Sequence, residues 1–273
     1  MFAIASLVIA AIAFVVALAG AFGAFDGGDD DPATAAGDDG GLDLEDDGAV
    51  ADPSADADEV ARSSAAAMGE VLSVEFGLQR DGAPVFIDEF KRIALDSLRG
   101  QFTVPTRAQA ELNVTVNGDL ATRLGAVAVD GEVWISNPVT GDFETLPAGY
   151  DIDPSKFFDP QNGWRPLLAN LQNVRLVGVD DRGGDRYQIT GTAPAAQVSD
   201  ITVGLVAGQD VDVMLWIHPT TYLVTAAEFE TVIDGERSRW VLELGHYGDT
   251  FEIEPPENIR PTPAASTANT TSP

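Results

Sequence analysis

Apolar and polar residues alternate one by one over long stretches between residues 72 and 254, and this period of two restricts the chain to β-sheet. Residues 72–79 read LSVEFGLQ, in which every second side chain is apolar. Successive side chains of a strand point to opposite faces, so this segment predicts a strand with one buried face. The same pattern predicts further strands near residues 85–95, 98–104, 106–117, 120–129, 132–137, 174–181, 185–191, 209–217, 221–233, 236–245 and 250–254.

Short turns join many of these strands. Asp130-Gly131, Gly183-Gly184 and Asp234-Gly235 supply the residues that tight hairpins favour. Helix signals are sparse: Trp164, Leu167, Leu168 and Leu171 recur at helical spacing, and Val198, Ile201 and Leu205 indicate a second short helix, although Thr202 and Val203 leave a strand open. We therefore expect an α+β domain, in which a strongly curved antiparallel sheet wraps over short helices.

Residues 1–25 form an apolar run without a charge. At about 1.5 Å per residue the run is long enough to span a hydrocarbon core of roughly 30 Å. A transmembrane anchor and a secretory signal cleaved after Ala19 or Ala24 both fit, and a buried core helix is a third alternative. An acidic stretch follows, with no basic residue until Arg62, and the membrane potential favours leaving it outside. We predict an extracytoplasmic protein of the cell membrane or envelope, anchored by or exported through residues 1–25.

Composition sets the expected organisation of the rest. Residues 26–62 are mostly Asp, Gly and Ala and predict an acidic disordered tether. The folded domain is expected at 63–258, with a disordered tail at 259–273. The net charge of −29, with Lys91 and Lys156 as the only lysines, argues against nucleic acid and anionic lipid head groups as partners, because both would be repelled.

Catalytic signals are weak. The chain has no Cys, which excludes disulfides, thiolate metal sites and cysteine nucleophiles. His218 and His246 are its only imidazoles, and the sequence has no G-x-S-x-G, H-E-x-x-H or P-loop motif. Acidic pairs such as Asp151 and Asp153 lack the ligand count of a calcium loop. A glycosidase-like pair of acids stays open, because the separation of such groups is a structural quantity. We expect no catalytic residue, no metal and no cofactor.

Two adjacent aromatic residues point to apolar surface instead. Phe157 and Phe158 lie in an expected loop between Pro154 and Pro160, just before the helix of Trp164. Loops seldom carry adjacent Phe residues unless these cover something apolar. They either plug the core of the domain or gate a pocket for an apolar ligand.

A series of short segments resembles one known family. In order along the chain they are VFID at 85–88, FTVP at 102–105, DGEVWI at 130–135, LPAGY at 146–150, FDP at 158–160, GW and LL at 163–164 and 167–168, ITG at 189–191, LWI at 215–217 and FEIEPP at 251–256. Residues from about 70 to 256 are similar to the LppX/LprAFG-type lipoproteins of mycobacteria and related bacteria.

The resemblance implies a half-barrel of antiparallel strands with helices on its concave side, enclosing a hydrophobic cavity. It also implies binding of acylated lipid or glycolipid outside the membrane and its transport across the cell envelope, with a lipid transporter as a further partner. Members of the family typically carry a lipobox Cys, and this chain has Ala21 at that place. An anchor in residues 1–25 followed by the tether could replace the attached lipid.

Our main hypothesis is therefore a non-catalytic lipid-binding or lipid-transfer protein. Burial of hydrocarbon at about 0.8 kcal/mol per methylene needs only residues that line the cavity. The alternatives are an envelope scaffold or transporter partner with a filled core, and an acid-pair hydrolase. The candidate cavity residues are large or branched apolar side chains on the expected strands, helices and aromatic loop: Phe76, Leu78, Val114, Val116, Trp134, Phe157, Phe158, Trp164, Leu168, Leu171, Ile201, Leu205, Val213 and Leu215.

Overall fold

One large antiparallel sheet organises the computed structural model, which describes residues 48–86, 91–137, 140–145, 163–180, 185–201, 206 and 208–260. The strands are β1 (Ser73–Gly82), β2 (Val85–Phe86), β3 (Ile93–Thr103), β4 (Arg107–Val116), β5 (Leu120–Val129), β6 (Glu132–Ser136), β7 (Phe143–Thr145), β8 (Gln172–Asp180), β9 (Arg186–Ala193), β10 (Val211–Ile217), β11 (Val224–Ile233), β12 (Glu236–Gly245) and β13 (Ile259–Arg260). The helices are α2 (Ala57–Met68), α3 (Trp164–Ala169) and α4 (Ala195–Ile201). The α+β class expected from the sequence is confirmed.

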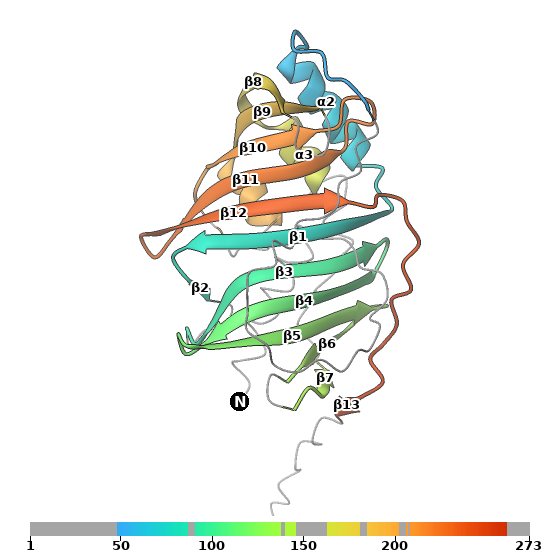
Figure 1. Ribbon diagram of the computed structural model, residues 1–273, viewed down its shortest axis with the longest axis vertical. Coiled ribbons are helices and arrows are strands. Elements are labelled where there is room, and N and C mark those ends of the chain that lie inside the picture. Colours follow the sequence, from blue (N-terminus) through green and yellow to red (C-terminus); the bar gives the residue numbers. More distant parts are fainter. Residues whose placement is uncertain are drawn as a thin grey trace, which may run out of the picture.

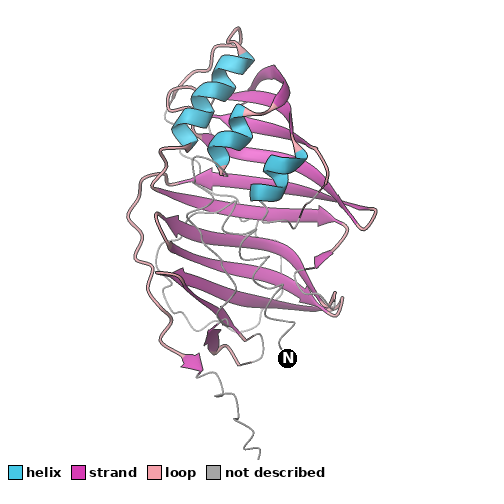
Figure 2. Ribbon diagram, turned by 180° about the vertical axis from the view of Figure 1, so that it is seen from behind, coloured by secondary structure: helices cyan, strands magenta, loops and turns pink. Residues whose placement is uncertain are grey.

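The sheet joins two runs of consecutive antiparallel strands. Its order is β13-β7-β6-β5-β4-β3-β1-β12-β11-β10-β9-β8, with β2 paired to β3. Strand β1 therefore lies between β3 and β12, so the first long strand of the described chain is paired with the last. The sheet is open and curved, and the three helices cover one face of it over the half formed by β8–β12 (Figures 1 and 2).

Register decides which side chains face the helices. Phe76 lies opposite Gly100 on β3 and Leu244 on β12, and Leu78 lies opposite Leu98 and Leu242. All of these apolar side chains are fully buried in the main core. Gly100 leaves room for the Phe76 ring, since a Cβ atom at position 100 would lie only 2.3 Å from that ring. This face, called the core face below, carries the hydrophobic interior.

Helix α2 begins inside the range that composition assigns to the acidic tether. The Asp56 side chain accepts a hydrogen bond from the Glu59 backbone N–H at 3.0 Å, and Asp58 and Glu59 occupy the first turn. Acidic residues are favourable there because the helix dipole presents partial positive charge. The apolar residues Val60, Ala61, Ala65 and Met68 bury one side of the helix. The same carboxylates that signal a solvated tether thus also start a helix.

The segment after β12 is extended but unpaired where the sequence predicts a strand at 250–254, so that strand prediction is wrong. Ile253 is 1% exposed and packs with Val129 and Trp134, on the face of the sheet opposite the core face. The Arg107 guanidinium donates to the Ile253 carbonyl at 3.1 Å. Further along, β13 pairs in parallel with β7 and covers that edge of the sheet (Figure 1). The alternation in 250–254 therefore reflects packing against side chains, not pairing in a ladder.

Among the described residues, no helix is long and apolar enough to cross a membrane. The apolar run at 1–25 lies outside the described residues.

Tyr247 ties the end of β12 to β11, and its loss should destabilise the fold. The side chain is partly buried against the main core, its hydroxyl donates to the Val224 carbonyl, and burial raises the pKa of Tyr247 well above its usual value of 10.0. We expect Tyr247→Phe to lower the free energy of unfolding by about 1–2 kcal/mol in urea titrations, because the buried carbonyl loses its donor. Tyr222→Phe is the matched control, since Tyr222 is half-buried and stacks on Tyr187 through its ring. Equal effects of the two substitutions would contradict the assignment.

Candidate functional site

An apolar pocket lies between strands β9–β12 and the helices α3 and α4. Its volume is about 60 Å³, enough for part of a hydrocarbon chain and far short of a whole lipid. The described lining residues come from six elements and one connecting residue: Trp164 and Leu167 of α3, Val198 and Ile201 of α4, Val206, Ala193 of β9, Val211, Val213 and Leu215 of β10, Ala227, Phe229 and Thr231 of β11, and Leu242 of β12. The short helices therefore form one wall and the sheet forms the other (Figure 2).

The wall of this pocket consists almost entirely of carbon. Of the lining residues that the structure describes, Thr231 alone carries a hydroxyl, and its oxygen accepts a hydrogen bond from the Trp240 indole N–H at 2.9 Å. Trp240 in turn stacks on Phe229, with ring centroids 6.3 Å apart. Among the described residues that line the pocket, none has a titratable side chain. Such a surface can hold an apolar chain by desolvation.

Strand pairing places the sheet-borne lining residues together. Val213 lies opposite Phe229, and Leu215 lies opposite Ala227, which in turn lies opposite Leu242. Directly opposed residues share a face of the sheet. The small side chain of Ala227 between two leucines keeps space open below the helices. Short apolar residues at such crossing points therefore matter as much for the pocket as the large ones.

The candidates taken from the sequence fall into four groups. Trp164, Ile201, Val213 and Leu215 line the pocket. Phe76, Leu78, Val114 and Leu168 are buried in the same core without lining it, and Val116 and Leu171 pack against that core while partly exposed. Phe157, Phe158 and Leu205 lie outside the described residues. Trp134 lies on the opposite face of the sheet.

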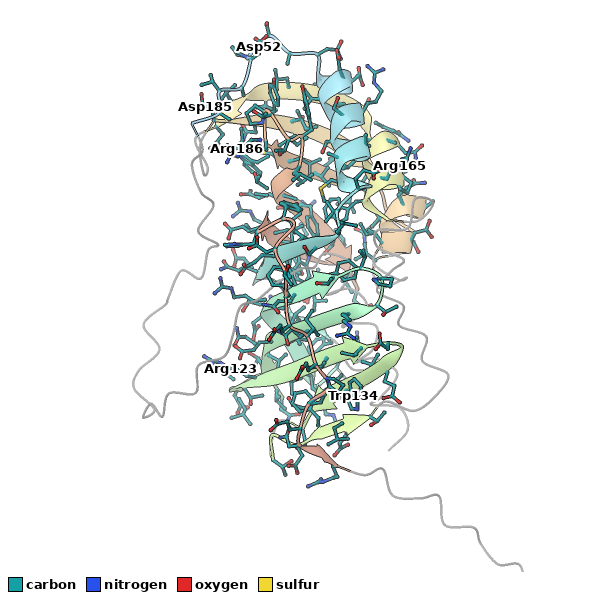
Figure 3. All side chains as sticks on the ribbon, turned by 90° about the vertical axis from the view of Figure 1, so that its right-hand side faces the viewer. Asp52, Arg123, Trp134, Arg165, Asp185 and Arg186 are labelled. Atoms are coloured by element: carbon teal, nitrogen blue, oxygen red, sulfur yellow. The ribbon has the colours of Figure 1, made fainter. Side chains whose placement is uncertain are left out.

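The position of Trp134 follows from the alternation of the strand that carries it. Val133 and Ile135 belong to the main core, so the side chain between them points the other way. Trp134 is opposite Val127 and packs with Val129 and Ile253. It lies at the end of the sheet remote from α2 (Figure 3). We correct its assignment as a cavity residue, which rested on its size and not on its place in the alternation.

Sequence reasoning missed the other lining residues: Leu167, Ala193, Val198, Val206, Val211, Ala227, Phe229, Thr231 and Leu242. Leu167 and Val198 belong to the apolar stripes that predict the two helices, so the signal for them was present. Strand β11 carries Ala227, Phe229 and Thr231 at alternate positions. Whether they line the pocket depends on how β11 pairs with its neighbouring strands. Without the register, an Ala and a Thr give no sign of lining a pocket.

Both histidines have local roles. His218 is 9% exposed, and its Nδ1 accepts from the backbone N–H groups of Thr220 and Thr221 at 3.2 and 3.1 Å, which shapes the turn before β11. His246 lies near Glu75 and Asp249, with nitrogen–oxygen distances of 3.3 and 3.4 Å. Neither histidine lines the apolar pocket. Within the described part of the chain, no cluster of three or more His, Asp and Glu side chains could hold a metal ion.

Glu75 is a buried acid on the face opposite the core. It is 8% exposed, and this burial raises the pKa of the Glu75 carboxyl above its ordinary 4.5, against the opposing effect of His246 and Arg99. The folded chain therefore keeps this proton to higher pH than the unfolded chain. Stability contributed by protonated Glu75 is present at low pH and decreases as the pH rises above 4.5.

Comparison with known proteins assigns the chain to a family. The family model of the LppX_LprAFG lipoproteins matches residues 56–253. The chain belongs to the LppX_LprAFG lipoprotein family. The resemblance inferred from the short segments is thereby confirmed.

A relative and two solved structures support the assignment. The chain is 24% identical over 168 residues to the lipoarabinomannan carrier protein LprG of Mycobacterium tuberculosis, covering 60% of this chain and 69% of that protein. The crystal structure of LprF from Mycobacterium bovis superposes with a TM-score of 0.58 at 19% identity, covering 75% of this chain and 98% of LprF. The M. tuberculosis lipoprotein LppX gives 0.51 at 18% identity, covering 72% and 97%. These two structures show a common fold.

Replacing Glu75 with its neutral isostere should change how stability depends on pH. We expect the free energy of unfolding of Glu75→Gln, relative to the unsubstituted chain, to increase between about pH 4 and pH 7, because the cost of ionising a buried carboxyl is removed. Urea titrations across this range measure it. The same comparison in a His246→Gln background separates the imidazole from burial. A difference that falls with rising pH would contradict the raised pKa.

Proposed function

We propose that this protein is an extracytoplasmic lipid-binding protein, which holds the apolar part of an acylated lipid or glycolipid between its sheet and its helices. The observation that carries the proposal is the carbon-lined pocket at β9–β12, α3 and α4, whose described wall residues have no titratable side chain. Membership of a family that includes a protein named as a lipoarabinomannan carrier supports a lipid-binding or carrier role.

Desolvation supplies the binding energy in this proposal. Each methylene transferred from water contributes about 0.8 kcal/mol, so three or four methylenes in the pocket contribute about 3 kcal/mol. A complete acyl chain needs more apolar surface than a volume of about 60 Å³ provides. The aromatic pair Phe157 and Phe158 and the residue Leu205 remain our candidates for extending the site. The enclosed cavity of the half-barrel therefore stays part of the proposal.

The rest of the chain gives the proposal a place in the envelope. Residues 1–25 would anchor the protein in the membrane or direct its export, and the acidic residues that follow would act as a tether. Because α2 begins at Ala57 and Ala51 is already buried, we place the start of the folded domain near residue 48 instead of 63. Transport of the lipid across the envelope, with a transporter as partner, is the corresponding biological role.

A scaffold or transporter partner with a filled core is the second candidate, and the small volume of the pocket favours it. Native mass spectrometry of the full chain, isolated from its producing membrane in mild detergent, separates the two. A lipid retained at near-unit occupancy supports the carrier. A clean protein mass that does not change on incubation with envelope lipids would overturn it.

Blocking the pocket should remove the lipid and leave the fold intact. Val213 lines the pocket and is only partly buried, so Val213→Trp can place its ring across the pocket without overpacking the core. We expect at least a tenfold loss of retained lipid, about 1.4 kcal/mol, measured in the same spectra. Val232→Trp is the matched control, since Val232 is 45% exposed on a strand that also contributes lining residues. Equal lipid retention in both variants would place the lipid elsewhere.

A further inference from the structure

A second hollow lies near the β11–β12 turn, where β1 and β3 separate. Its volume is about 550 Å³, and it is lined by Arg80, Pro84, Phe86, Lys91, Ala94, Asp96, Thr115, Asn117 and Gly118. Register places part of this lining on the face opposite the core face, whereas Arg80 lies opposite Trp240 of the main core. Phe86 lies opposite Ala94, and Ala94 lies opposite Thr115, whereas the residues next to them, Val85, Leu95 and Val114, belong to the main core.

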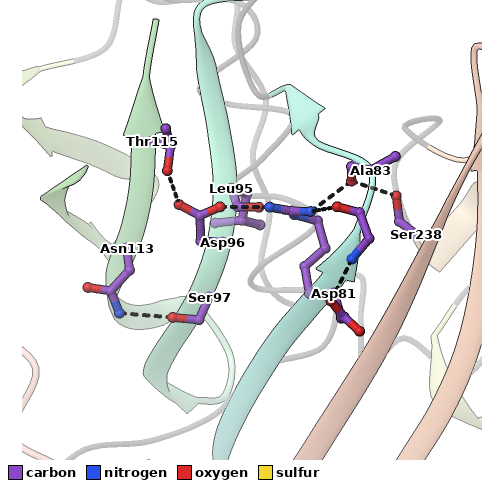
Figure 4. A network of polar contacts seen from close by, with 10 residues as sticks. Asp81, Ala83, Leu95, Asp96, Ser97, Asn113, Thr115 and Ser238 are labelled. Carbon is purple, nitrogen blue, oxygen red and sulfur yellow. Dashed lines mark hydrogen bonds and ion pairs between the residues drawn. The ribbon is translucent and has the colours of Figure 1, made fainter. Parts of the chain in front are cut away.

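Asp96 lines this hollow and is held from two sides. It occupies the irregular position of β3 between Leu95 and Ser97, where the pairing with β4 shifts. One carboxylate oxygen accepts from the Arg80 guanidinium at 2.7 Å, and the other accepts from the Thr115 hydroxyl at 2.6 Å (Figure 4). The carboxylate is still 36% exposed, and each oxygen has a further lone pair. The Asp96 carboxylate can therefore accept a hydrogen bond from a ligand without first changing its orientation.

Arg80 is used entirely within the protein. Its guanidinium donates to the Leu95 carbonyl at 2.6 Å and to the carbonyls of Gly82 and Ala83 at 2.8 Å each, besides Asp96. The side chain is 10% exposed. Its role is to hold β1, β3 and the turn after β1 in fixed positions around the hollow. The guanidinium therefore shapes the site and leaves little for a ligand.

The charges of the hollow are paired. Arg80 forms an ion pair with Asp96, and Lys91 forms one with Asp234 of the β11–β12 turn. An anionic ligand would have to break one of these pairs and would approach a chain of net charge −29. A cation would compete with Arg80 for the same carboxylate. A neutral ligand avoids both costs.

The remaining groups of the hollow suit a ligand rich in hydroxyl groups. Asn117 is exposed and lies in the β4–β5 turn at a φ of 52°. Its side-chain amide can both donate and accept hydrogen bonds. The half-buried Phe86 ring offers an apolar surface for C–H groups. Uncharged polar side chains continue next to the hollow, where the Asn113 amide donates to the Ser97 hydroxyl at 2.9 Å (Figure 4).

We propose that this hollow, centred on Asp96, Asn117 and Phe86, binds a neutral sugar. Sugar rings combine hydroxyl edges, which match the carboxylate and the amide, with C–H faces, which match the aromatic ring. This site shares no lining residue with the apolar pocket, so the inference does not depend on the proposed function. The sugar can belong to a glycolipid head group or to a free glycan.

Saturation-transfer NMR on the full chain tests the site. The chain is kept in a detergent without a sugar head group, and the ligands are methyl α-mannopyranoside and mannotriose, with inorganic phosphate as competitor. We expect transfer to the sugars, no competition by phosphate, and about fivefold weaker binding in Asn117→Gly and in Phe86→Leu, as expected for the loss of one contact. Glycine keeps the positive φ at position 117. Asp119→Asn, in the same turn but outside the lining, is the control and should bind as the unsubstituted chain does.

The outcomes separate the alternatives. Equal transfer in the unsubstituted chain and both variants, or displacement of the sugar by phosphate, overturns the proposal. Native mass spectra of the same variants then distinguish the source of the sugar. Retention of glycolipid that falls in Asn117→Gly together with mannotriose binding assigns the site to the head group, and unchanged retention assigns it to a free glycan. If no sugar binds but the protein still retains lipid, the sugar proposal is wrong and the carrier proposal is unaffected.

Discussion

The pairing of β1 with β12 is the interaction on which the rest of the structure depends. It runs from Glu75 opposite Gly245 to Gly82 opposite Ser238, and it joins residues that are far apart in the chain. Without it the two runs of antiparallel strands would each end in an exposed edge with unpaired backbone groups. With it, Phe76 and Leu78 meet Leu244 and Leu242 and continue one apolar face across both halves. Forming such a distant pair costs loop entropy, which only the burial of this continuous face can offset.

The sequence predicts best what is decided locally. Most strands and the helix of Trp164 follow from spacing and turn residues, because a hairpin such as that at Asp130-Gly131 needs only its own neighbours. Long-range decisions were out of reach. Strand β3 runs from Ile93 to Thr103 and joins the end of the predicted strand at 85–95 to the one at 98–104. The irregularity at Asp96 preserves the pairing that a break in the alternation conceals. Helix α2 was hidden for a related reason: an acidic first turn reads as a solvated tether until its buried side is known.

The same limit applies to the pocket. Whether a residue lines the pocket depends on the residue that lies opposite it on the neighbouring strand. Leu215 and Ala227 lie opposite each other, and both line the pocket. The sequence could supply the large members, such as Trp164 and Val213, because size and alternation mark them as buried. It could not supply Ala227 or Thr231, whose importance lies in the space that they leave or in a hydroxyl engaged by Trp240. Trp134 is the converse case, since a large aromatic residue is buried equally well on either face.

The apolar pocket and the second hollow offer a ligand different kinds of contact. Desolvation of hydrocarbon is not directional, so a carbon-lined pocket discriminates by length and shape and is insensitive to what the chain is attached to. Selection among lipids with similar acyl chains must then come from polar contacts elsewhere. Hydrogen-bonding groups held in place by their neighbours provide such selection, because an ill-fitting ligand leaves them unpaired. Asp96, fixed by Arg80 and Thr115, is a group of this kind, and it stands where the strands β1 and β3 separate, outside the apolar interior. Keeping the directional groups out of the apolar pocket leaves its described wall free of charge, and the proposed sugar site would supply the directional contacts.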